Sequence, residues 1–138
     1  MKKQLFVLLS LGLLLSGASA YAQTVNMKVN VPFSFIVSRT ALPSGQYTIQ
    51  GLGTAGNAMS IRTPDNKAKS LVLARRCESL KTSEQSKLVF HRYGDRYFLA
   101  QIWMAGSNSG QEIPKSPRET EVARDYTVHE VVLVAALR

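Results

Sequence analysis

The sequence predicts an all-β fold, an antiparallel β-sandwich or small barrel with one short helix at about residues 116–124. Three observations predict it. Apolar and polar residues alternate along several segments, a period of two that is typical of strands with one buried face. Turn-forming clusters separate these segments at intervals of about 8–12 residues. A single helix-start motif occurs, close to the C-terminus.

The first 22 residues have the pattern of a secretory signal. Lys2 and Lys3 precede the apolar run 5–15, and Ala20-Tyr21-Ala22 forms a small-x-small cleavage site. We therefore expect a signal peptide over 1–22 and a single β-rich domain over 23–138. Removing these 22 of the 138 residues, both lysines among them, leaves 116 residues and lowers the net charge from +8 to +6. The expected location is the periplasm or the extracellular space.

The mature part of the chain has no apolar run long enough to cross a bilayer as a helix, which takes about 20 residues. We therefore expect that the protein does not span the membrane after signal cleavage. Its basic residues are scattered along the chain. This spread favours weak attraction to anionic surfaces over one dense binding block.

The odd positions of residues 25–37 are all apolar, which predicts one strand, or two strands divided near Pro32. Residues 42–45, with Pro at the second position and Gly at the fourth, are typical of a turn. Turn clusters at 53–57 and 64–67 follow. Three further strands are expected between these turns, at 46–52, 58–63 and 69–77.

Segments 87–93 and 96–104 flank Gly94-Asp95, a pair that suits a two-residue hairpin turn of type I′ or II′. Both faces of this hairpin carry apolar side chains, so we expect it to be central and covered on both sides. The turn also sets the register. The expected cross-strand pairs are Phe90 with Leu99, Val89 with Ala100, and His91 with Phe98.

Residues 105–111 (AGSNSGQ) are expected to form a flexible loop. Ser116, Pro117 and Glu119 then have the spacing of a capping box with proline at the first helical position. This motif predicts the helix, which we expect to end near Arg124. The last strand is predicted over 127–137.

The sequence lacks the residue patterns that catalytic and metal sites require. His91, His129 and Cys77 are the soft or imidazole ligands of the mature chain, and they show no paired spacing, so we predict no metal. The segment 106–110 has Asn108 at its centre, where a nucleophile elbow requires Ser. No glycine-rich phosphate loop precedes a helix, so we expect no cofactor.

Cys77 is the single cysteine, in a compartment expected to be oxidising. We expect a small buried hydrophobe at a strand end. An intermolecular disulfide and a catalytic nucleophile are the alternatives. Arg75 and Arg76 would favour the thiolate, but no histidine lies nearby in the sequence to act as the base.

Basic and aromatic residues interleave along the hairpin and are the candidate binding residues. Aromatic faces and guanidinium forks suit sugar rings and anionic polymers. The alternative is that the aromatic rings pack in the core and the arginines are solvated at the hairpin tip. Export argues against nucleic acid. The expected partners are an anionic envelope polymer, a polysaccharide or another protein. The candidate residues are Arg92, Tyr93, Arg96, Tyr97 and Trp103.

Four segments stand out together: 31–37 (VPFSFIV), 42–49 (LPSGQYTI), 86–103 (SKLVFHRYGDRYFLAQIW) and 110–124 (GQEIPKSPRETEVAR). They resemble a group of small, uncharacterised, exported bacterial proteins. The group has a VPF-F-V start, an LP-G-Y turn, an LVF-RYGD-YFL-IW hairpin and an ELP-S--E helix start. Ser44 departs from this pattern, where an Ala is expected, and the tail from Tyr126 lies outside it. The resemblance implies export and one β-rich domain, and implies no activity.

These observations favour a non-enzymatic exported protein, a binding or structural module of the cell envelope or extracellular space. The alternative is a small extracytoplasmic hydrolase. Such an enzyme would need Cys77 or a serine beside His91 or His129, with an acid to orient the histidine.

Overall fold

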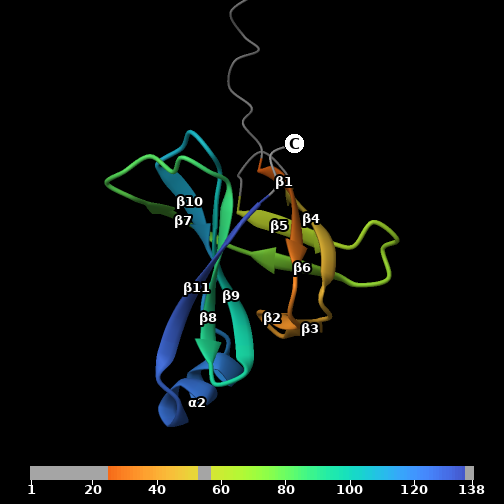
Figure 1. The fold of residues 1–138 in the computed structure, drawn as a ribbon, viewed down its shortest axis with the longest axis vertical. Coiled ribbons are helices and arrows are strands. Elements are labelled where there is room, and N and C mark those ends of the chain that lie inside the picture. The colour runs from red at the N-terminus through yellow and green to blue at the C-terminus, as the bar shows by residue number, and fades with distance from the viewer. Residues whose placement is uncertain (1–24, 53–56, 136–138) are drawn as a thin grey trace, which may run out of the picture.

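The computed structural model describes residues 25–52 and 57–135. The predicted signal peptide over 1–22 lies outside them. The described residues form two β-sheets and one helix, which confirms the predicted all-β class with one short helix (Figure 1). Both sheets are open, so the arrangement is a sandwich.

The smaller sheet has four antiparallel strands in the order β1-β4-β5-β6. The alternating sequence of β1 suits a sheet with one buried face, because every second side chain of this strand is buried and the others are exposed. The predicted division near Pro32 is also present, since β1 ends one residue before this proline. The bounds are β1 Asn26–Val31, β4 Gly45–Leu52, β5 Ala58–Arg62 and β6 Lys69–Leu73.

The larger sheet has the order β11-β8-β9-β10-β7, and the predicted hairpin β8–β9 lies inside it. A short hairpin, β2–β3, joins through the parallel pairing of Ile36 with Phe98, an exception to the otherwise antiparallel pattern. The bounds are β2 Phe35–Val37, β3 Thr40–Leu42, β7 Arg75–Glu78, β8 Lys87–Tyr93, β9 Arg96–Trp103, β10 Ser109–Glu112 and β11 Val128–Val134.

The main core lies between the two sheets. Tyr47 and Ile61 of the smaller sheet are fully buried there with Phe90 and Ile102 of the larger one. A second cluster lies on the opposite face of the larger sheet, where helix α2 (Pro117–Asp125) covers it. Both faces of β8–β9 are therefore covered, as the apolar residues on both faces predict. The second cluster consists of Ile36, Tyr93, Phe98 and Val122.

The register of the hairpin is predicted correctly near its turn and wrongly farther away. Phe90 pairs with Leu99 and His91 with Phe98, but Val89 pairs with Gln101, where we expected Ala100. A β-bulge between Val89 and Phe90 shifts the register by one residue. A turn determines only the pairs that follow it without interruption, so the bulge is not visible in the turn sequence.

The segment 69–77, expected as one strand, is two strands in different sheets. The amide of Ala74 still donates to the carbonyl of Asn57 beside β5, and the chain then crosses to the larger sheet. There β7 pairs with β10, which forms in the segment 105–111 that we expected to be a loop. That expectation was wrong because serine and glycine indicate flexibility only when no neighbouring strand supplies hydrogen bonds.

Helix α2 begins at Pro117 and ends at Asp125, one residue beyond the expected end. Ser116 caps it as predicted, because its Oγ accepts a hydrogen bond from the amide of Glu119 at 3.2 Å. The carboxylate of Glu119 does not complete the capping box. It turns toward β8, where it accepts a hydrogen bond from Tyr93. No helix within 25–52 or 57–135 is long and apolar enough to cross a membrane.

Candidate functional site

The five candidate binding residues do not share one surface. Arg92 pairs with Tyr97 and Tyr93 with Arg96, and consecutive residues of a strand point to opposite faces. Arg92 and Tyr97 therefore lie on the face toward the smaller sheet, and Tyr93 lies on the face toward α2. Trp103 is at the far end of β9 from the hairpin turn.

Burial separates these residues further. Tyr93 is 1% exposed and Trp103 8% exposed, whereas Arg96 is exposed at the hairpin tip. The ring of Tyr97 stacks on Phe33, with 3.8 Å between the ring centres, and packs against the main core. These aromatic side chains are thus largely packed inside the protein. Of these aromatic residues, Trp103 also lines a pocket.

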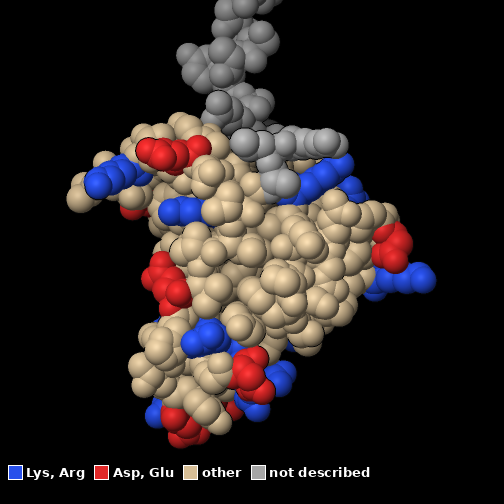
Figure 2. Space-filling view, viewed as in Figure 1, with Lys and Arg blue, Asp and Glu red and all other residues tan. Residues whose placement is uncertain are grey.

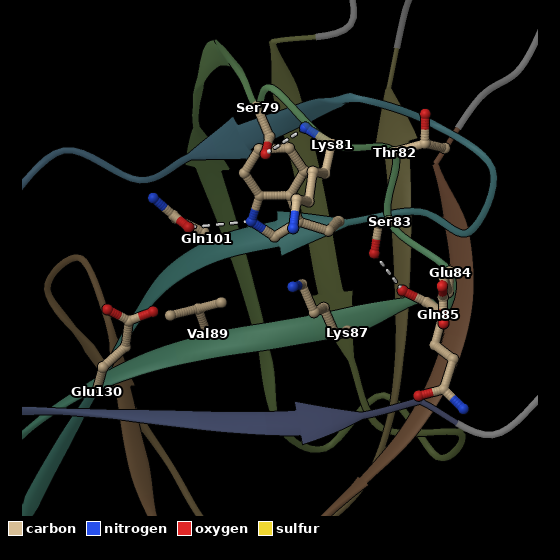
Figure 3. Close-up of a pocket in the computed structure, with 11 residues that line it drawn as sticks. Ser79, Lys81, Thr82, Ser83, Glu84, Gln85, Lys87, Val89, Gln101 and Glu130 are labelled. Carbon is tan, nitrogen blue, oxygen red and sulfur yellow. Dashed lines mark hydrogen bonds between the residues drawn. The ribbon is translucent and has the colours of Figure 1, made fainter.

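This pocket, about 560 Å³ in volume, lies on the outer face of the larger sheet (Figure 3). Three strands supply its floor, and the polar connection between β7 and β8 supplies its wall. The sequence shows this connection as polar and without a period, but has no signal that it forms a wall. The floor residues are Lys87, Val89, Gln101, Trp103 and Glu130, and the wall residues are Ser79 and 81–85.

One floor residue, Trp103, pairs with Gly110 across β9 and β10. A Cβ atom added to Gly110 would lie 2.7 Å from two atoms of the indole ring, so the ring lies directly against this glycine. Glycine in a strand is typical of such a close approach. The indole Nε1 donates a hydrogen bond to Gln101 Oε1 at 3.0 Å, which fixes both side chains (Figure 3).

The wall is held by backbone hydrogen bonds to the loop between β9 and β10. The amide of Gly106 donates to the carbonyl of Ser83 at 2.8 Å, and the amide of Ser83 donates to the carbonyl of Ser107 at 3.0 Å. Ser83 Oγ also donates to the carbonyl of Gln85 at 2.6 Å. The shape of the wall is therefore fixed by hydrogen bonds to a loop that is distant in the sequence.

The charges around the pocket balance. Lys81 and Lys87 contribute positive charge, and Glu84 and Glu130 contribute negative charge. Figure 2 shows the same mixture over one face of the molecule, where basic and acidic side chains are interspersed. The pocket thus offers donors and acceptors of both signs beside the apolar side chains of Val89 and Trp103.

A second polar cluster lies where α2 packs against β8. Glu119 Oε2 accepts a hydrogen bond from Tyr93 Oη at 2.9 Å and lies 3.4 Å from His91 Nδ1. Glu119 is 4% exposed, which is unusual for an acidic side chain. A buried acidic group needs polar partners, and these two neighbours supply them. Glu130 pairs with His91 from β11, so the histidine is placed between two acidic residues.

Cys77 lies far from both histidines. It is half-buried in β7, and three strand spacings separate β7 from the strand of His91, about 14 Å in total. Burial raises the pKa of the Cys77 thiol, and the charge of Glu112 raises it further, against the opposing effect of the Gly110 amide. The thiolate is therefore disfavoured. Among the described residues, no three His, Cys, Asp or Glu side chains gather as a metal site would require.

Comparison with known proteins gives no relative from which a role could be transferred: no family model, curated protein or solved structure matches this chain.

Proposed function

We propose that this chain is a non-enzymatic protein, exported to the periplasm or the extracellular space, that binds a neutral polysaccharide in the Trp103 pocket. The pocket carries the proposal. Its volume of about 560 Å³ falls within the usual range of ligand sites. Two apolar side chains, Val89 and Trp103, among polar and charged ones suit a sugar unit, which has an apolar ring face and hydroxyl groups at its edge.

The balance of charges favours a neutral polysaccharide over an anionic polymer. Glu84 and Glu130 would repel carboxylates or phosphates as strongly as Lys81 and Lys87 would attract them. Hydroxyl groups, in contrast, can accept from the ammonium groups and donate to the carboxylates.

The binding test is affinity electrophoresis in gels that contain hydroxyethyl cellulose or, separately, alginate. We expect hydroxyethyl cellulose to retard the protein more strongly than alginate. Gln101→Ala and Lys87→Ala should each weaken the retardation about three- to tenfold, because each removes one polar partner. Arg96→Ala is the control, since Arg96 is exposed on the same strand and outside the pocket. Loss of retardation in Arg96→Ala alone would move the site to the hairpin tip.

Export is supported by the pattern of residues 1–22. The test is cell fractionation of the chain with a C-terminal tag, followed by N-terminal sequencing. We expect a protein outside the cytoplasm that begins at Gln23. A cytoplasmic protein that retains Met1 would contradict the proposal.

Hydrolysis outside the cytoplasm is the second candidate function, and one observation favours it. The distance of 3.4 Å between His91 Nδ1 and Glu119 Oε2 is that of a histidine held by an acid. The cross-strand partners of His91 are Phe98 and Glu130, and neither supplies a hydroxyl or thiol nucleophile. The test is hydrolysis of p-nitrophenyl acetate. An activity that is lost in His91→Ala and kept in His129→Ala would support the hydrolase.

A further inference from the structure

Strand β6 forms one edge of the smaller sheet. Among the described residues it pairs with β5 alone, over five consecutive residue pairs without a bulge. The amide of Ala74 points toward β5, where it bonds to Asn57. Because backbone groups alternate along an antiparallel strand, the N–H and C=O groups of Leu71 and Leu73 point away from β5. Among the described residues these four groups have no backbone partner outside β6, so they are available to a further strand.

The side chains of this edge are apolar. Leu71 is 74% exposed and Leu73 is 73% exposed, whereas Ser70 and Val72 between them are buried against the core. Natural edge strands usually carry a charge, a proline or a bulge that discourages pairing. Lys69 is the one charged residue of β6, and it is at the beginning of the strand.

A groove of about 320 Å³ runs along β6. Its opposite wall consists of residues 114–117, which precede and begin α2, together with Ser38 and Arg39. Pro114 and Pro117 have no backbone N–H group, so this wall contributes mainly side-chain contacts. Hydrogen bonds to a ligand backbone would come from β6.

The charge of the groove has one sign. Arg39 and Lys115 line it and are both exposed, and its lining contains no carboxylate. This is the opposite of the Trp103 pocket, where charges balance. The groove therefore complements an extended ligand that carries negative charge.

We propose that β6 and its groove bind an extended, acidic peptide segment of another protein by strand addition. The segment continues the smaller sheet and bonds to the free backbone groups of Leu71 and Leu73. Its apolar side chains cover these two leucines on the outer face, and its carboxylates meet Arg39 and Lys115 on the groove side. This surface is separate from the Trp103 pocket, so the two proposals stand or fall independently.

The test uses two fluorescein-labelled peptides, acetyl-(Val-Glu)₄-amide and acetyl-(Val-Lys)₄-amide, with fluorescence anisotropy as the readout. We expect the glutamate peptide to bind at least about tenfold more tightly. Leu71→Ala keeps the N–H group and should weaken binding about threefold through lost apolar contact. Leu71→Pro removes the N–H group as well, and should weaken binding about tenfold or more. Proline is tolerated here because the N–H of Leu71 is not bonded to β5.

A peptide modification tests the backbone contact with the protein unchanged. The glutamate peptide is N-methylated at every Val or, separately, at every Glu. Alternate residues of a strand face the same edge, so one methylated peptide should lose binding and the other should retain it. Equal binding of the two methylated peptides would overturn strand addition.

Charge reversal tests the groove. The double variant Arg39→Glu with Lys115→Glu should bind the lysine peptide more tightly than the glutamate peptide. The control, Lys28→Glu with Lys67→Glu, changes the net charge equally at exposed sites outside the groove, and should keep the original preference. An unchanged preference in the first double variant would overturn the proposal. Self-association that Leu71→Pro abolishes, without peptide binding, would instead identify a second copy as the occupant.

Discussion

Tyr93 Oη donates a hydrogen bond to Glu119 Oε2 over 2.9 Å, and this contact joins strand β8 to helix α2 in the protein interior. Both residues are almost completely buried. A carboxylate removed from water needs hydrogen-bond donors, so the tyrosine stabilises the position of the helix as well as filling space.

Tyr93→Phe should lower the free energy of unfolding by about 1–3 kcal/mol, because it leaves a buried carboxylate short of a donor. Urea denaturation followed by circular dichroism measures this change. Tyr126→Phe is the control, since Tyr126 is 54% exposed and its change should stay within about 0.5 kcal/mol. Equal losses in the two variants would show that the buried hydrogen bond contributes nothing specific.

Stability should fall at alkaline pH. Burial, followed by the hydrogen bond and charge of Glu119, raises the pKa of Tyr93 from 10.0 to about 12. The unfolded chain therefore loses this proton at lower pH than the folded chain. The stabilisation is complete below about pH 10 and is lost as the pH rises toward 12.

The measurement is urea unfolding at intervals between about pH 8 and pH 11. Burial also raises the pKa of Tyr47, which contributes a decline of the same sign. Tyr93→Phe should therefore show a shallower decline than the original protein without becoming flat. A decline of identical slope in the two proteins would exclude Tyr93 as a source.

Gly110→Ala should destabilise the protein by about 1–3 kcal/mol, since the new methyl group has no room beside a packed ring. The added Cβ would lie 2.7 Å from two atoms of the Trp103 indole. Gly51→Ala is the matched control in the other sheet, where the nearest atom to the added Cβ is 3.5 Å away. Thermal unfolding compares the two, and an equal fall in Tm would contradict this account of Gly110.

Cys77 should react slowly with iodoacetamide at about pH 8, because burial and Glu112 raise the pKa of its thiol and thiolate is the reactive form. Mass spectrometry of timed samples gives the rate. The same protein in urea is the control and should react several times faster. Faster reaction in the folded state would reveal an activated thiol and would contradict the effect of burial and Glu112 on its pKa.

Local patterns predicted the elements of the hairpin and the helix well. The turn at Gly94 has φ +63°, and Asp95 is not among the residues with positive φ, which fits type II′, one of the two expected types. Ser116 caps the helix as its spacing indicates. In each case the deciding contacts lie within a few residues along the chain.

The candidate site was harder to predict. Of the five residues proposed for binding, Trp103 alone borders the pocket. Gln101 and Lys87 looked like ordinary strand residues in the sequence. They line the pocket because of the bulge at Val89 and the wall that the connection between β7 and β8 supplies. Neither feature has a local signal.

Within an uninterrupted strand, the alternation of residues already indicates which side chains share a face, because the period is two whatever the neighbouring strands are. The bulge in the hairpin breaks this period, and the sequence has no signal for it. The tertiary structure decided which faces are covered and which strands are neighbours. It divided the segment 69–77 at Ala74 between two sheets, and it made a strand of 109–112 by supplying partners on both sides. Pairing depends on backbone hydrogen bonds between distant segments, which the alternation of side chains does not encode.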